Sequence, residues 1–180
     1  QDEYLYERLS GVKSIVEIEK IFRKTFGKIG GKEPERIDMA SKKLRVHFKD
    51  HFIWVKDLGL GTQIFLRTLM IIKGLKPEIL LFEEPENHLN PAIYEKLILA
   101  ILEAVDKENL QVFITTHNID IVDKFTLIIE EKFETLKNEF NLIRTRINEK
   151  SQLRCVYYSF DDYIELRSEK FEMNLLEEHE

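Results

Sequence analysis

Short apolar runs that end abruptly in acidic or polar residues are the clearest pattern along the chain. The first run covers residues 79–82 and stops at Glu83 and Glu84, and the second covers residues 112–114 and leads into a polar segment with His117. Such runs are typical of strands buried on both faces of a parallel sheet. In these sheets the functional groups gather where the carboxyl ends of the strands stop. We therefore expect Glu83, Glu84 and His117 to lie on one edge.

The segment between the two runs has the pattern of a helix. Asn90 suits an N-cap and Pro91 suits the first helical position. Apolar residues then recur every four positions, at Ile93, Leu97, Ile101 and Val105. A helical crossover between two strands is right-handed in nearly all known cases, and it makes the two strands parallel. The acidic residues and the histidine can therefore share one site.

Helical periodicity covers three further segments, at residues 3–26, 62–75 and 118–147. The second of these is apolar on more than one face, which indicates a largely buried helix. The third starts at Asn118, a candidate N-cap, and has apolar residues at a four-three spacing: Ile129, Phe133, Leu136, Phe140, Ile143 and Ile147. This spacing predicts a heptad seam that packs against the parent domain, because it is too short for an independent coiled coil.

Two antiparallel hairpins are expected from alternating apolar positions. The first would pair residues 44–48 with residues 52–55 across a short polar turn. The second would pair residues 154–160 with residues 163–167 across two aspartates, and a short helix ending at residues 177–178 would follow. Together with the strand-helix-strand unit, these elements predict an α/β fold with parallel strands, flanking helices and antiparallel hairpins.

Three motifs carry a resemblance to ATPase domains of the ABC type. Residues 82–91, FEEPENHLNP, resemble the Walker B strand and D-loop, and residues 115–118, TTHN, resemble the H-loop. Upstream, residues 57–63, DLGLGTQ, resemble the signature motif. The paired glutamates followed by Pro-Glu-x-His-Leu-x-Pro are most similar to the non-transporter branch, which includes OLD-like, RecF-like and SMC-like ATPases. The resemblance covers residues 40–125 and implies a partial P-loop NTPase fold whose parallel strands carry Walker B and the H-loop.

The resemblance implies roles for the residues at the predicted edge. Glu83 would hold Mg²⁺ on the β- and γ-phosphates of ATP, Glu84 would polarise the attacking water, and His117 would contact the γ-phosphate. Phosphoryl transfer needs a metal ion, donors to the developing charge and one group that positions the nucleophile, so these residue types fit. The commoner Walker B acid is aspartate, which makes Glu83 a longer ligand arm. In relatives the D-loop crosses a dimer interface, so Asn87 and His88 would lie near the opposing nucleotide.

The signature-like segment implies a further contact with the nucleotide. The residues expected to make it are Gly59, Gly61, Thr62 and Gln63. They lie at the start of a predicted helix, where backbone N–H groups and the helix dipole favour an anion. Relatives carry a serine or an acid where this chain has Leu60, and leucine cannot donate a hydrogen bond to phosphate. What remains for phosphate binding is the glycine-rich backbone.

No Walker A loop, G-x-x-x-x-G-K-[ST], occurs in the sequence. The nearest candidate, residues 27–33, has the wrong spacing and an acid where the magnesium-binding hydroxyl belongs. Because this loop lies in the amino-terminal half of ABC-type ATPases and the chain begins with Gln1, we expect a carboxyl-terminal part of such a domain. Residues 1–42 would be a helical segment, the tail of an insertion, and residues 43–180 the carboxyl-terminal half. The Walker A half would belong to the same chain or a separate one, and this chain alone would not hydrolyse ATP.

Composition and charge narrow the other possibilities. The 180 residues are 43% hydrophobic and 33% charged, which is enough to bury a core. No apolar stretch reaches the ~20 residues that span a bilayer and no leader is recognisable, so we expect a cytoplasmic protein without membrane contact. Cys155 is the only cysteine, which excludes an internal disulfide framework. The net charge of −6 argues against strong DNA binding by this segment, although the missing half could bind DNA.

Two functions remain open from the sequence. The first, implied by the resemblance, is an ABC-type ATPase that uses ATP and Mg²⁺ and forms head-to-tail dimers around two nucleotides, in DNA repair or phage defence. The second is a degenerate, ATPase-like scaffold for protein interactions that has lost the Walker A loop and the polar group of the signature. The intact Glu84 and His117 favour the first function, because a scaffold does not need them.

Overall fold

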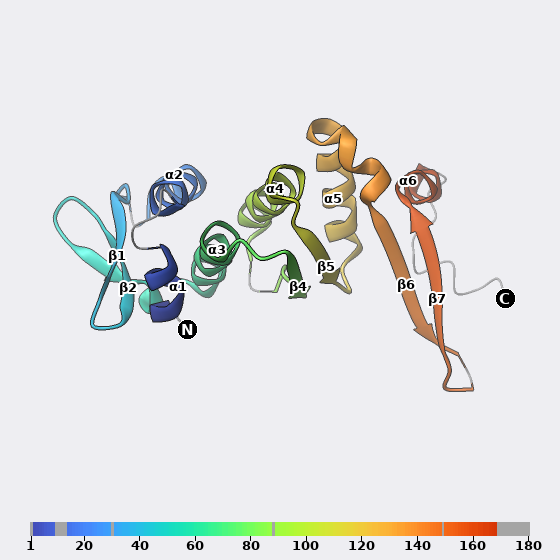
Figure 1. The fold of residues 1–180 in the computed structure, drawn as a ribbon, viewed down its shortest axis with the longest axis horizontal. Coiled ribbons are helices and arrows are strands. Elements are labelled where there is room, and N and C mark those ends of the chain that lie inside the picture. Colours follow the sequence, from blue (N-terminus) through green and yellow to red (C-terminus); the bar gives the residue numbers. More distant parts are fainter. Residues whose placement is uncertain (1, 10–13, 30, 88, 149, 169–180) are drawn as a thin grey trace. The chain divides into compact units, whose positions relative to one another are not determined.

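The computed structural model describes residues 2–9, 14–29, 31–87, 89–148 and 150–168 of the chain (Figure 1). These residues fall into two compact units, Gln1–His117 and Asn118–Glu180. The first unit holds a three-stranded antiparallel sheet and a parallel pair of strands, and the second holds an antiparallel hairpin. None of the helices among the described residues combines the length and the apolar character needed to cross a membrane.

The first unit begins with two helices, α1 (Asp2–Leu9) and α2 (Ser14–Phe26). They cover the described part of the segment predicted as one helix, residues 3–26, of which residues 10–13 are outside the described part. In α2, Ile18 and Phe22 are completely buried, because residues four apart share one face of a helix. The apolar periodicity of this segment therefore forms a stripe that faces the core.

An antiparallel sheet follows, with the strand order β1 (Arg36–Ala40), β2 (Lys43–His47) and β3 (Phe52–Trp54). The predicted hairpin of residues 44–48 and 52–55 is confirmed, since β2 and β3 pair in antiparallel register. The strand β1 is not predicted by the sequence pattern, because Ser41 and Lys42, rather than a glycine, make its turn to β2. Both residues have positive φ, of 48° and 62°, as tight two-residue hairpin turns require.

A buried helix leads from this sheet to the parallel strands. After the 3₁₀ helix η1 (Val55–Asp57), α3 (Leu60–Met70) continues into a π-helical turn, η2 (Ile71–Leu75). This element agrees with the buried helix predicted for residues 62–75. Its fully buried side chains form part of the core: Phe65, Leu66, Leu69 and Met70.

The predicted strand-helix-strand unit is confirmed by β4 (Ile79–Glu83), α4 (Pro91–Glu108) and β5 (Gln111–Thr115). The two strands pair in parallel, in a register that places Glu83 opposite Thr115. Helix α4 begins at the predicted Pro91, and its apolar stripe is buried at Leu97, Ile98 and Ile101. Burying this stripe holds the crossover on the core, so the two strands end side by side.

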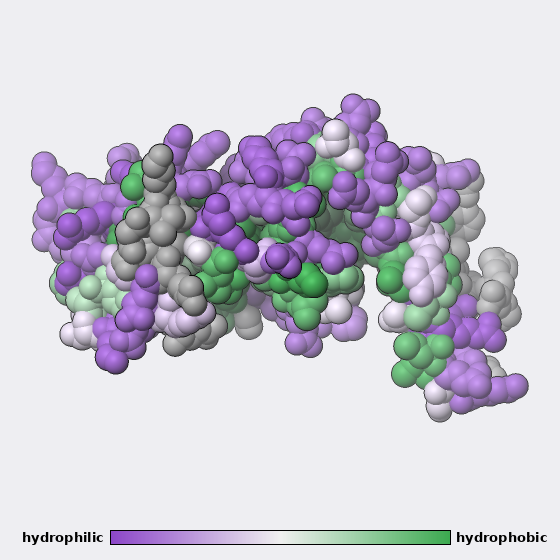
Figure 2. Space-filling model, viewed as in Figure 1, coloured by the Kyte–Doolittle hydropathy of each residue, from purple (hydrophilic) through white to green (hydrophobic). Residues whose placement is uncertain are grey.

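One face of the β4–β5 pair is exposed, although the sequence pattern predicts strands buried on both faces. Successive strand residues point to opposite faces. Leu80 is 9% exposed, whereas Ile79, Leu81 and Phe113 are 56%, 74% and 53% exposed. In Figure 2, hydrophobic surface is visible where Figure 1 shows these strands. Parallel sheets are normally covered on both faces, so the described residues supply only one of the two layers.

The second unit contains α5 (Ile119–Lys132), the 3₁₀ helix η3 (Glu134–Glu139), the strands β6 (Asn141–Ile147) and β7 (Leu153–Ser159), and α6 (Phe160–Ser168). The prediction of one helix with a heptad seam over residues 118–147 is wrong beyond α5. Ile143 and Ile147 lie on the strand β6 and are 51% and 73% exposed. A spacing of four puts two residues on the same face of a helix or of a strand. Their β-branched side chains, with that of Thr145, favour the strand.

The predicted second hairpin is also wrong, because β7 pairs with β6 and residues 163–167 belong to α6. The amide of Asp162 donates to the hydroxyl of Ser159 at 3.2 Å, and the amide of Ser159 donates to the carboxylate of Asp162 at 2.9 Å. This reciprocal capping starts a helix where the two aspartates were expected to form a turn. The predicted short helix at the carboxyl terminus falls on residues 169–180, outside the described part.

Candidate active site

The carboxyl ends of β4 and β5 lie side by side, because the strands are parallel and in register. Glu83 is opposite Thr115, and the amide of Glu84 donates to the carbonyl of Thr115 at 2.8 Å. This bond extends the pairing by one residue beyond β4. The loops that follow, residues 84–87 and 116–117, therefore meet at one edge of the strand pair.

Glu84 and His117 are in direct contact at this edge. The Nε2 atom of His117 lies 3.1 Å from Oε1 of Glu84, and the side-chain amide of Asn87 donates to Oε2 of Glu84. The side chain of His117 is 93% exposed and that of Glu84 is 32% exposed, and exposed pairs of this kind add little to stability. The arrangement instead holds a carboxylate from two sides, next to an imidazole that a ligand can reach. Such a pair can orient a water molecule and contact a phosphate.

Glu83 lies beside this pair and is exposed at the end of β4. It makes no ion pair with any described residue, so its carboxylate is available to a cation. No group of three or more His, Cys, Asp or Glu residues that could hold a metal ion by itself occurs within the described ranges. Mg²⁺ is usually held by one or two carboxylates together with phosphates and water. A single exposed acid at this edge therefore fits Mg²⁺ that arrives with a nucleotide.

The signature-like residues lie at the amino end of α3. Gly59 is the N-cap of the helix, and Gly61 and Thr62 belong to its first turn. The first amides of a helix have no partner within it, and the helix dipole favours an anion there. Leu60, in the same turn, is 47% exposed and offers no side-chain donor. The backbone of this turn can therefore bind a phosphate, but its leucine cannot.

The other predicted site residues have different surroundings. The side-chain amide of Gln63 donates to the backbone carbonyls of Lys56 and Leu58, at 3.1 and 2.9 Å, so it fixes the loop before α3. No hydrogen bond or ion pair joins the amino end of α3 to the Glu84–His117 pair in the part of the chain that is described. Asn87 contacts Glu84 of its own chain. His88 lies outside the described residues.

Three polar residues without a predicted role lie next to this edge. The hydroxyl of Thr116 donates to Oε1 of Glu86. The Oε2 atom of Glu86 and the hydroxyl of Tyr94 are buried, and neither has a hydrogen-bond partner among the described residues. Burial and the nearby Glu86 carboxylate raise the pKa of Tyr94 above its ordinary value. The sequence signal that could have identified Glu86 and Thr116 is their position, two residues after Glu84 and directly before His117.

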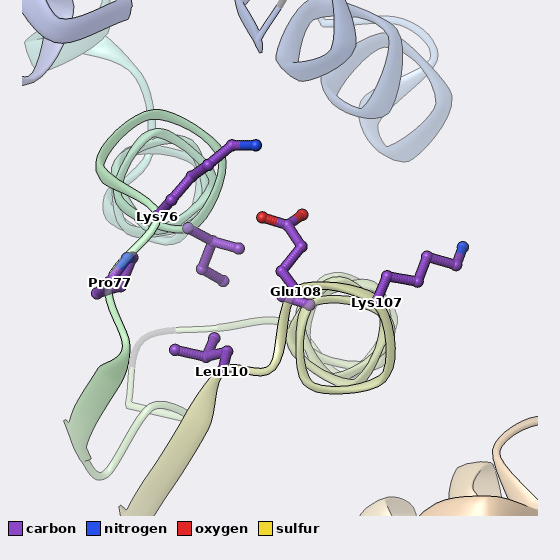
Figure 3. Close-up of a pocket in the computed structure, with 7 residues that line it drawn as sticks. Lys76, Pro77, Lys107, Glu108 and Leu110 are labelled. Carbon is purple, nitrogen blue, oxygen red and sulfur yellow. The ribbon is translucent and has the colours of Figure 1, made fainter.

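A pocket of about 250 Å³ occurs at the other end of the same strands (Figure 3). Its lining includes Lys76, Pro77, Glu108 and Leu110. The first two precede β4 and the last precedes β5, and a five-residue strand spans about 13 Å. In addition, Glu108 is engaged by the buried Lys73, whose Nζ lies 2.8 Å from its Oε1. This pocket is therefore separate from the Glu84–His117 edge.

The sequence is similar to a protein family and to a curated relative. Residues 14–123 match the family described as "AAA domain, putative AbiEii toxin, Type IV TA system". The "Probable ABC transporter ATP-binding protein p29" of Mesomycoplasma hyorhinis is 28% identical over 114 residues, which make up 63% of this chain and 44% of that protein. The matched region thus spans less than half the length of that relative.

The fold is similar to that of solved structures, among them the following two. A chain from "Structural biochemistry of ATP-driven dimerization and DNA stimulated activation of SMC ATPases" has a TM-score of 0.54 at 13% identity, over 91% of this chain and 96% of that chain. The second structure is the Smc head domain with an extended coiled coil, bound to the C-terminal domain of ScpA, from Pyrococcus furiosus. Its TM-score is 0.60 at 12% identity, over 87% of this chain and 37% of that chain. The fold is thus mixed α/β and resembles an SMC ATPase head. Because the family match spans more than half of the chain, the protein belongs to the family described as "AAA domain, putative AbiEii toxin, Type IV TA system".

Proposed function

We propose that this chain is the carboxyl-terminal half of an ABC-type ATPase domain of the OLD-like or RecF-like branch, and that it supplies the signature, Walker B, D-loop and H-loop elements. The observation that carries the proposal is the 3.1 Å contact between Glu84 and His117 at the adjacent ends of two parallel strands. The contact is too exposed to contribute much to stability, so its placement is better explained by chemistry.

The residues at this edge divide the work of phosphoryl transfer. Glu84 would orient and polarise the attacking water, because His117 and Asn87 fix its carboxylate from two sides. His117 would contact the γ-phosphate through its exposed imidazole, and Glu83 would be the ligand of Mg²⁺. When bound, Mg²⁺ neutralises charge on the β- and γ-phosphates. Positioning and electrostatic stabilisation suffice for this reaction, which needs no covalent participation by the protein.

A Walker A loop from another part of the protein would hold the phosphates, in the same polypeptide or in a second chain. The exposed apolar face formed by Ile79, Leu81 and Phe113 supports this, because a parallel sheet is normally covered on both faces. The match to less than half of the curated relative's length supports it as well. Under this proposal, residues 1–42 are the tail of an insertion and residues 43–180 are the carboxyl-terminal half.

The active form would be a head-to-tail homodimer that encloses two ATP molecules. The amino end of α3, with Gly59, Gly61 and Thr62, would face the nucleotide of the opposing subunit. The lack of a bond from this turn to Glu84 or His117 among the described residues suits such a role. ATP-driven dimerization is attributed to the SMC ATPases that share the fold. DNA repair or phage defence would be the process, with DNA bound through the Walker A-containing part.

The test is Glu84→Gln in the chain joined to its Walker A-bearing part. This change keeps the size of the side chain and removes the carboxylate. We expect ATP binding to persist and turnover to fall by about 10²-fold or more, so that the nucleotide-bound dimer accumulates. Glu78→Gln is the matched control, because it removes the same charge just before the amino end of β4.

Unchanged ATP turnover in Glu84→Gln would refute the role given to this residue. An assembled protein that binds no ATP would contradict the ATPase proposal and favour the scaffold alternative. The measurements are equilibrium binding of a fluorescent ATP analogue with Mg²⁺ and release of inorganic phosphate.

A further inference from the structure

Glu86 has one carboxylate oxygen in a buried position. Its Oε2 atom is buried without a hydrogen-bond partner among the described residues, and so is the hydroxyl of Tyr94, whose pKa is raised first by burial and then by the Glu86 charge. Burying a charged group is unfavourable unless hydrogen bonds compensate for its lost hydration. A buried carboxylate oxygen without a hydrogen-bond partner among the described residues therefore calls for an explanation.

The hydrogen bond that Glu86 does make joins the two loops of the candidate active site. Its Oε1 atom accepts from the hydroxyl of Thr116. Thr116 directly precedes His117, and Glu86 is two residues beyond Glu84. Hydrogen bonds to a charged acceptor are roughly twice as strong as neutral ones. This bond thus ties the loop after β4 to the loop after β5, one residue away from His117.

We propose that Glu86 and Thr116 are positioning residues that set the contact between Glu84 and His117. The inference rests on the proposed function, since it concerns the geometry of the ATPase site. Near this contact, the amide of Asn87 donates to the carbonyl of Glu84 at 3.0 Å and the amide of Glu84 donates to the carbonyl of Thr115 at 2.8 Å, whereas the His117 side chain is 93% exposed. The Glu86–Thr116 hydrogen bond therefore adds a side-chain link between the two loops, directly before His117.

Loss of this bond is expected to slow the chemistry without weakening ATP binding. A displacement of about 1 Å in an active site can cost 10²-fold in rate. Neither Glu86 nor Thr116 is proposed to touch the nucleotide, so the affinity for ATP should stay the same. The variant Thr116→Val removes the hydroxyl at constant size, Thr116→Ser keeps it, and Thr145→Val on the exposed surface of β6 is the matched control.

The first measurement is amide hydrogen exchange in the chain itself, which needs no nucleotide. We expect the amides of Glu84 and Asn87 to exchange about 10-fold faster in Thr116→Val, because the loop opens more often. Thr116→Ser and Thr145→Val should exchange like the unmodified protein. The amide of Leu97, in the buried part of α4, should be unchanged in all variants and shows that they are folded.

The second measurement is single-turnover ATP hydrolysis by the chain joined to its Walker A-bearing part. Thr116→Val should lower the rate by about 10²-fold at unchanged ATP affinity, and Thr116→Ser should restore it. In a Glu84→Gln background, Thr116→Val should cause no further loss, because it acts through Glu84. If Thr116 only stabilised the fold, Thr116→Val would lower the rate of hydrolysis in both the unmodified protein and Glu84→Gln.

The positioning role of Glu86 and Thr116 is overturned by either of two results. The amides of Glu84 and Asn87 could exchange as slowly in Thr116→Val as in the unmodified protein, or Thr116→Val could hydrolyse ATP at an undiminished rate. The two proposals fail in different ways. If the assembled protein binds no ATP, the ATPase proposal is refuted, and if Glu84→Gln hydrolyses ATP normally, the role of Glu84 is refuted. In both cases the exchange measurement still decides whether the Glu86–Thr116 bond holds the two loops together.

Discussion

Leu81 offers the most direct test of whether another part of the protein covers the parallel strands. It is 74% exposed on β4, and its partner in the register, Phe113, is 53% exposed. Leu81→Ala removes three carbons, worth roughly 2.4 kcal/mol on complete burial at about 0.8 kcal/mol each. Because 74% of Leu81 is still exposed and can be buried by the covering part, Leu81→Ala should weaken the binding of that part by about 1.8 kcal/mol. This corresponds to an affinity about 20-fold lower.

The assay compares this chain alone with the chain joined to its Walker A-bearing part. Alone, Leu81→Ala should change the free energy of urea unfolding by less than about 0.5 kcal/mol, because the side chain is already in water. If the Walker A-bearing part is a separate chain, Leu81→Ala should lower the affinity between the two chains about 20-fold. If it is in the same polypeptide, the variant should lower the free energy of unfolding by about 1.8 kcal/mol. Leu127→Ala, at a position 46% exposed on α5, is the control. Equal association of Leu81→Ala and the unmodified chain would show that this face remains open.

Two further predictions concern partly buried carboxylates that accept hydrogen bonds. Tyr163→Phe should lower the free energy of unfolding by about 1.5 kcal/mol in a urea titration, because the fully buried Tyr163 hydroxyl donates to the Asp123 carboxylate at 2.6 Å. An unchanged free energy of unfolding would mean that this hydrogen bond does not stabilise the fold. Burial alone would raise the pKa of Asp38, but hydrogen bonds from Arg45 and His47 outweigh it and lower that pKa below its ordinary value of 3.8. The stability that Asp38 contributes should therefore be complete above about pH 4 and disappear as the pH falls through its folded-state pKa, so that Asp38→Asn flattens this part of the stability curve.

The sequence predicts the middle of the chain better than its flanks, because several local signals agree there. The apolar runs of β4 and β5 and the Asn90–Pro91 start of α4 all point to the same strand-helix-strand unit. At Ile143 and Ile147 the signals conflict, since their spacing suits a helix and a strand equally. Exposure is a different difficulty: Leu80 and Leu81 look alike in the sequence, and only the packing of the helices shows which of them is covered.

In the candidate site, too, some features can be predicted from local sequence signals and others depend on three-dimensional packing. Glu84 and His117 can be found from the sequence because each comes shortly after a strand, and the ends of adjacent parallel strands meet. The bond between Glu86 and Thr116 depends on the relative register of β4 and β5, which no local pattern contains. Contacts between loops are therefore the part of this site that only the three-dimensional structure supplies.

The backbone of Glu84 provides an argument for function that does not depend on any motif. Its φ of +44° is left-handed, which costs a residue other than glycine on the order of 1–3 kcal/mol. The other such residues among those described lie in hairpin turns or directly after helices, where this conformation is expected: Ser41, Lys42, Lys76, Asn109 and Ser151. Glu84 instead follows a strand that could have continued without strain. Strained residues persist only where their surroundings fix them, and here the Thr115 carbonyl, Asn87 and His117 do so. Because this turn brings the Glu84 carboxylate to His117, the strain supports a functional need for that contact.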